Sequence, residues 1–133
     1  MNAIFKVAAV VLACAPVAAK AWTADNRLDV NPLPGGAYEV IGDPGSGGSE
    51  YWCAAGDYAL RVLGAGATDR VFITRGRGAP ETSQRRSGVQ FSLTPPATVP
   101  DGLQIFMDMR RVGDSMNVAF ARNYCLDDKV VDY

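Results

Sequence analysis

The chain of 133 residues contains no histidine, and this absence removes the most common catalytic base in proteins. Neither a Ser-His-Asp nor a Cys-His arrangement can be assembled without an imidazole to accept the proton of the nucleophile. The most common zinc ligand is missing as well. We therefore expect no enzymatic activity, metal or cofactor, and a histidine-free hydrolase with paired carboxylates is the minority alternative.

The chain also lacks an excess of charge of either sign, since its formal net charge is −1. Such a balance gives no reason to expect general attraction to nucleic acid or to an anionic membrane. Lysine is scarce: apart from Lys6, Lys20 and Lys129, every cationic residue is arginine. Any charged site must therefore be local, and the arginine bias reflects either a GC-rich genome or a need for forked guanidinium contacts.

Long apolar runs are missing after the first residues, and none approaches the ~20 residues of a membrane-spanning helix. At the start, Lys6 precedes an apolar run at 7–19, and the small residues Ala19 and Ala21 precede a cleavage site that would leave Trp22 as the N-terminus. This pattern predicts a signal peptide over residues 1–21. Residues 22–133 then form a single exported domain, periplasmic or secreted, with a net charge of −3.

Two other interpretations of the N-terminus remain open. The apolar run could be a buried helix, although it has no polar face. Residues 11–14 also loosely resemble a lipoprotein processing box, which would make Cys14 a lipid-bearing first residue. We expect contact with a membrane only if Cys14 is lipidated.

Cysteine is rare too, and removal of the signal peptide leaves only Cys53 and Cys125. In an oxidising compartment two such cysteines are expected to pair. A bridge that closes a loop of this length would stabilise the fold by roughly 4 kcal/mol in the chain-entropy model. The alternative is a reactive Cys53 thiol at a helix N-terminus, but the chain offers no CxxC pair and no histidine base.

Residues 49–63 carry the clearest helical pattern. Ser49 is expected to cap this helix, and Gly64 to end it. Asp57 and Arg61 are spaced as a polar i,i+4 pair on the surface. The residues expected to face the core are Trp52, Ala55, Ala59, Val62 and Leu63.

Alternating or β-branched segments predict strands at residues 37–41, 69–75, 87–93 and 103–112, with a further short strand near 27–30. Residues 115–125 fit either a helix capped by Ser115 or Asn117, or a strand in a hairpin with 103–112. We prefer the helix because alanine and asparagine are poor sheet formers. The expected fold is α+β: a small antiparallel sheet packed against one main helix, with a short C-terminal helix and one disulfide.

The strongest charge feature is the arginine arm, residues 75–86, with the sequence RGRGAPETSQRR between two predicted strands. Long loops of this kind are often functional or disordered, so a mobile solvated loop is the plainer interpretation. Arginine forks suit carboxylate or phosphate groups, and the arm lacks aromatic residues for stacking bases. We therefore expect an anionic protein or envelope component as partner, not nucleic acid, bound by Arg75, Arg77, Arg85 and Arg86.

Other candidate sites are weaker. The glycine-rich loop at residues 42–49 matches neither a P-loop nor a GxGxxG motif. Acidic residues suited by type to hydrolysis or calcium binding have no supporting spacing, and surface solvation explains them more simply. These are Asp57, Asp101, Asp108 and Asp114 for hydrolysis and Asp127, Asp128 and Asp132 for calcium.

The segments WCAAGDYA, RVFITRGRG, VQFSL and NVAFARNYC occur in this order. With these segments the chain resembles small secreted proteins of alphaproteobacteria over most of residues 22–133. The resemblance implies an exported domain with a Cys53–Cys125 pair, and it transfers no catalytic residue.

Three functions follow as hypotheses. The first is a periplasmic or cell-envelope binding module whose arginine arm contacts an anionic partner. The second is an inhibitor of a secreted hydrolase that presents the same arm as its inhibitory loop. The third is the histidine-free hydrolase.

Overall fold

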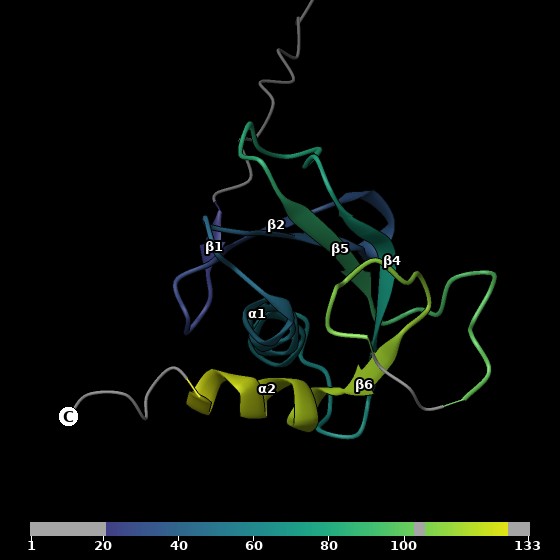
Figure 1. Cartoon of the computed structure of the whole chain (residues 1–133). Helices are drawn as coiled ribbons and strands as arrows, with labels where there is room; N and C mark the ends of the chain where they lie inside the picture. The colour runs from purple at the N-terminus through teal and green to yellow at the C-terminus, as the bar shows by residue number, and fades with distance from the viewer. Residues whose placement is uncertain (1–20, 103–105, 128–133) are drawn as a thin grey trace, which may run out of the picture.

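A computed structural model describes residues 21–102 and 106–127, which form an antiparallel sheet covered by one helix, with a second helix packed on the first (Figure 1). The six strands are arranged in the order β1-β2-β3-β5-β4-β6. The predicted α+β class is confirmed, as are the main helix, the short C-terminal helix and the disulfide. The elements are β1 (Trp22–Thr23), β2 (Asp29–Pro32), a 3-10 turn (Pro34–Gly36), β3 (Tyr38–Ile41), α1 (Gly48–Arg61), β4 (Arg70–Gly78), β5 (Gly88–Ser92), β6 (Ser115–Asn117) and α2 (Val118–Asp127).

The predicted strands at residues 37–41, 69–75 and 87–93 correspond to β3, β4 and β5, and the short early strand to β2. In the register of the central pair, Tyr38 lies opposite Phe91 and Val40 lies opposite Val89. These side chains are fully buried beneath α1, where Trp52 packs edge-on against Phe91 with ring centroids 5.2 Å apart. This face of the sheet forms the core, but the expected one-sided burial does not hold at β3, where Glu39 and Ile41 on the other face are only 1% and 2% exposed.

Helix α1 lies between the sheet and α2 (Figure 1), and this position buries it on both sides. Residues 51–59 are all buried, not only a single stripe. Gly56 permits close approach of the two helices, because a Cβ there would lie 2.7 Å from the Cβ of Ala121. The prediction that Val62 and Leu63 face the core is wrong: they are 45% and 38% exposed, beyond the last turn of the helix.

The two ends of α1 differ in how well they were predicted. Gly47, not Ser49, is the N-cap, and the Glu50 carboxylate accepts hydrogen bonds from the Gly47 N–H (3.0 Å) and the Ser49 hydroxyl (2.9 Å). At the other end, Gly64 has a φ of 69°, as expected for a glycine that terminates a helix.

The strand predicted at residues 103–112 is wrong for its described part, residues 106–112; residues 103–105 lie outside the described residues. Isolated hydrogen bonds hold this segment along the part of the β4 edge that β6 leaves uncovered, including one from the Arg77 N–H to the Met109 carbonyl (2.8 Å). Met109 is fully buried but has a φ of 64°, which is incompatible with a regular strand. Of the large apolar residues in this segment only Met109 is buried, whereas Phe106, Met107 and Val112 are 47%, 39% and 42% exposed. The apolar alternation therefore corresponds neither to a strand nor to a buried face.

Both interpretations of residues 115–125 were partly right. Strand β6 covers Ser115–Asn117, but it pairs with β4 and not with residues 103–112. The predicted helix follows as α2, and the Asn117 side chain caps it by accepting a hydrogen bond from the Phe120 N–H at 2.7 Å.

Candidate functional site

The arginine arm is shorter as a loop than its sequence indicates, because β4 continues through Gly78. Arg75 and Arg77 are therefore strand residues, held on a framework shared with β5. Only residues 79–87 connect the two strands, and Figure 1 shows this connection at the end of the sheet remote from α2.

A buried carboxylate fixes the connection to the sheet. Glu39 in β3 is 1% exposed, and its oxygens accept hydrogen bonds from the Glu81 and Thr82 N–H groups at 3.0 and 2.8 Å. The Thr82 hydroxyl (2.6 Å) and the Gln90 amide (2.9 Å) donate two more. Burial alone would raise the pKa of Glu39, but these hydrogen bonds outweigh it and hold the pKa below its usual value. These hydrogen bonds attach the arm to the sheet at Glu81 and Thr82, although both residues are exposed as expected of a solvated loop.

Three of the four predicted arginines line one pocket of about 580 Å³, which we call the arginine pocket. Arg75 is not among them, because it extends to Glu81 and pairs with that carboxylate at 2.7 Å. The opposite wall is the start of the glycine-rich loop. The lining residues are Gly42, Asp43, Pro44, Gly45, Arg77, Arg85, Arg86 and Ser87.

Arg77 is the fixed guanidinium of the arginine pocket. Its Nη2 donates to the Ser46 carbonyl at 2.8 Å, and its Nε donates to the Ser87 hydroxyl at 3.0 Å. The guanidinium carbon also lies 5.3 Å from the ring centroid of Tyr51, a cation–π distance. Tyr51 in turn shares a 2.7 Å hydrogen bond with Ser87. Within the described residues the Arg77 Nη1 has no partner, so it is available to a ligand.

The other two arginines are exposed and less constrained. Arg85 forms an ion pair with Asp43 across the pocket. Arg86 makes no hydrogen bond or ion pair with any residue that the structure describes. Three guanidinium groups thus face one carboxylate, which leaves a local charge of about +2 in a chain whose overall charge is negative.

The glycine-rich loop contributes shape and few free donors. The Gly42 N–H donates to the Ser87 carbonyl at 2.9 Å, and the Asp43 N–H donates to the Ser46 hydroxyl at 2.9 Å. The Ser46 N–H closes the turn onto the Asp43 carbonyl at 3.0 Å. Gly42 is required by close approach, since a Cβ there would lie 2.0 Å from the Tyr51 hydroxyl. The donors that this pocket offers are therefore mainly guanidinium groups and not a cradle of backbone amides.

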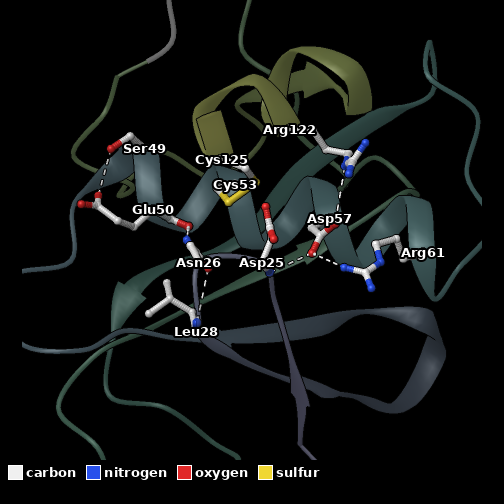
Figure 2. The surroundings of a disulfide bond; sticks show 10 residues. All are labelled: Asp25, Asn26, Leu28, Ser49, Glu50, Cys53, Asp57, Arg61, Arg122 and Cys125. Carbon is white, nitrogen blue, oxygen red and sulfur yellow. Dashed lines mark hydrogen bonds and ion pairs between the residues drawn. A yellow bond between two sulfur atoms is a disulfide. The ribbon is translucent and has the colours of Figure 1, made fainter. Parts of the chain in front are cut away.

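A second cluster of charge surrounds the disulfide (Figure 2). Cys53 of α1 and Cys125 of α2 are joined, which confirms the predicted pairing. One turn along α1, Asp57 is 0% exposed and lies between Arg61 (3.4 Å) and Arg122 (3.5 Å). Its Oδ2 also accepts a hydrogen bond from the Asp25 N–H at 3.0 Å. The predicted Asp57–Arg61 pair exists, but the prediction that it is a surface pair is wrong.

The remaining acidic candidates divide by burial. Asp114 is 5% exposed and pairs with Arg111 at 3.4 Å, so surface solvation does not explain it either. Asp101 and Asp108 are exposed, as expected. Of the calcium candidates, the Asp127 side chain, Asp128 and Asp132 lie outside the described residues. Within residues 21–102 and 106–127, no group of three potential metal-ligating side chains is found.

Comparison with protein-family models, with curated proteins and with solved structures gives no match. Neither helix in the described part of the chain is long and apolar enough to cross a membrane. The function must therefore be argued from the geometry of this chain alone.

Proposed function

We propose that this protein is an exported, non-catalytic binding module that holds an anionic partner in the arginine pocket. The observation that carries the proposal is the convergence of Arg77, Arg85 and Arg86 on one pocket with Asp43 as the only opposing carboxylate among its lining residues. A pocket with this charge attracts anions and repels cations, and guanidinium forks bind oxyanions in defined geometry. The partner is an anionic protein or envelope component.

Binding can be tested with three immobilised anionic probes: polyglutamate, a sulfated oligosaccharide and tripolyphosphate. We expect the chain from Trp22 to bind at least one of them and to elute as salt is raised. An Arg85→Ala/Arg86→Ala variant should lose most of this retention. The matched control is Arg70→Ala/Arg110→Ala, which removes the same charge from exposed residues outside the pocket. Equal retention of the two variants would contradict the proposal.

The proposal of export is supported by two features of the mature domain. Strand β1 begins at Trp22, directly after the expected cleavage site, and the Cys53–Cys125 disulfide suits an oxidising compartment. The resemblance to small secreted alphaproteobacterial proteins points the same way and stays a prediction. The mass of the processed protein tests it: an N-terminus at Trp22 is expected, whereas a lipid-bearing Cys14 would give a heavier, membrane-bound species.

Inhibition of a secreted hydrolase is the second candidate function, favoured by the attachment of Glu81 and Thr82 to Glu39. A preorganised loop loses little conformational entropy when it binds an enzyme. Two glycines inserted within residues 78–83 should abolish inhibition while every arginine is retained. A simple anion-binding module should tolerate the same insertion, so this variant separates the two functions.

A further inference from the structure

The arginine pocket already contains an anion of the chain itself, the Asp43 carboxylate against Arg85. Both side chains are open to solvent, with 48% of Asp43 and 53% of Arg85 exposed. Ion pairs of this exposure contribute little to stability, because water and salt screen them and both side chains lose rotational freedom. The pair can therefore separate at low cost when another anion competes for Arg85.

We propose that the group recognised in the arginine pocket is a carboxylate of an acidic protein segment, which displaces Asp43 from Arg85. This inference depends on the proposed binding function and names its ligand class. The resident ion pair shows which chemistry the site already accommodates. An incoming glutamate or aspartate side chain repeats the contact that Arg85 makes with Asp43.

The wall opposite the arginines favours this ligand over a phosphate. Loops that bind phosphate direct several free backbone N–H groups at the ligand. In this loop the N–H groups of Gly42, Asp43 and Ser46 are already bound within the protein. A planar carboxylate needs only the two parallel donors of one guanidinium, which Arg85 can supply.

The remaining cations indicate a second acidic residue in the ligand. With Arg85 occupied, the Arg86 guanidinium and the Arg77 Nη1 still lack a partner among the described residues. Arg77 is fixed by Ser46, Ser87 and the Tyr51 ring, so this donor is preorganised. The segment that fits is therefore one with two neighbouring carboxylates.

Titration of the chain from Trp22 with a blocked, fluorescent Gly-Glu-Gly-Glu-Gly peptide tests the proposal by fluorescence anisotropy. Because Asp43→Asn removes the internal competitor, it should tighten binding by about three- to tenfold at low salt. The matched control Asp101→Asn changes the same charge in an exposed residue outside the pocket and should leave affinity unchanged. A peptide with glutamine in place of glutamate should not bind.

The outcomes are separable. If Asp43→Asn binds the peptide no more tightly than the wild type while Arg85→Ala/Arg86→Ala loses it, displacement of Asp43 is wrong and the binding function stands. If inorganic phosphate or a sulfated oligosaccharide binds more tightly than the peptide, the ligand class is wrong. If the arginine variant affects no probe, the proposed function itself fails. Asp43→Ser, with thermal unfolding of each variant, guards against an effect of misfolding.

Discussion

Asp57 and Asp43 both face arginine side chains, and the difference between their surroundings separates a structural site from the proposed binding site. Asp57 is 0% exposed, and Arg61, Arg122 and a backbone N–H surround it. A charge removed from water must be compensated within the protein, so these partners are committed to the fold. Asp43 is half exposed and faces an excess of arginine, which is the basis of our proposal that its pocket exchanges one anion for another.

Loss of the disulfide should have the largest effect on the free energy of unfolding. A Cys53→Ala/Cys125→Ala variant removes a constraint on a loop with a sequence separation of 72 residues. We expect its free energy of unfolding to fall by about 4 kcal/mol, mainly because the unfolded chain gains entropy. Denaturant unfolding with and without reductant measures this, and reductant should leave the double variant unchanged. A loss below about 1 kcal/mol would mean that α2 is held by packing and Asp57 without the bridge.

Asp57→Asn should come next. Asparagine keeps the shape but removes the charge that Arg61 and Arg122 share, so the variant should lose about 2–3 kcal/mol. This is less than for a fully buried pair, because both arginines can turn toward water. Denaturant unfolding beside the exposed control Asp101→Asn gives the difference. Equal stability of the two variants would remove the contrast between Asp57 and Asp43.

What the sequence predicted well depended on composition or local spacing. The Cys53–Cys125 pair followed from cysteine count and compartment, and the helix and the three strands from periodicity. Asp57 was missed because its burial comes from α2, which is distant in the chain, while its spacing to Arg61 is that of a surface pair. No local pattern identifies such long-range burial.

The sequence identified which residue types form the candidate site but not how they are arranged in space. The arginines were found because they cluster in sequence, and three of them do line one pocket. Their framework was missed: Glu39 lies 42 residues from Glu81 and 43 residues from Thr82, and Asp43 lies 42 residues from Arg85, so only folding joins them. Tyr51, read as part of a helix, supports Arg77 through its ring.

Glu39 shares a feature with each of the two sites. It is buried like Asp57, and it holds the arm beside the arginine pocket. The pKa of Glu39 is below its ordinary value of 4.5, so the ionised Glu39 carboxylate stabilises the fold above pH 4.5. This stability is lost as pH falls through the lower pKa of the folded state. Glu39→Gln, which cannot accept all four hydrogen bonds, should cost about 1–2 kcal/mol at neutral pH.

The pH dependence of unfolding checks this assignment. The difference in stability between wild type and Glu39→Gln should be full near neutral pH and shrink below pH 4.5, as the wild-type carboxyl becomes protonated. Asp101→Asn, in an exposed residue, should follow the wild-type profile. A difference between wild type and Glu39→Gln that is constant with pH would show that lost shape, not lost charge, causes the effect.

The smallest effect on stability is expected for substitutions in the arginine pocket. Arg85→Ala/Arg86→Ala removes one exposed ion pair and one cation that has no partner among the described residues, so the free energy of unfolding should change by less than about 0.5 kcal/mol. Denaturant unfolding measures this on the same protein used for the binding experiments. A loss as large as that of Asp57→Asn would mean that these arginines hold the fold together. If the arginine pocket is the binding site that we propose, the protein should remain folded without these arginines, because their charge would act on a partner and not on the protein's own core.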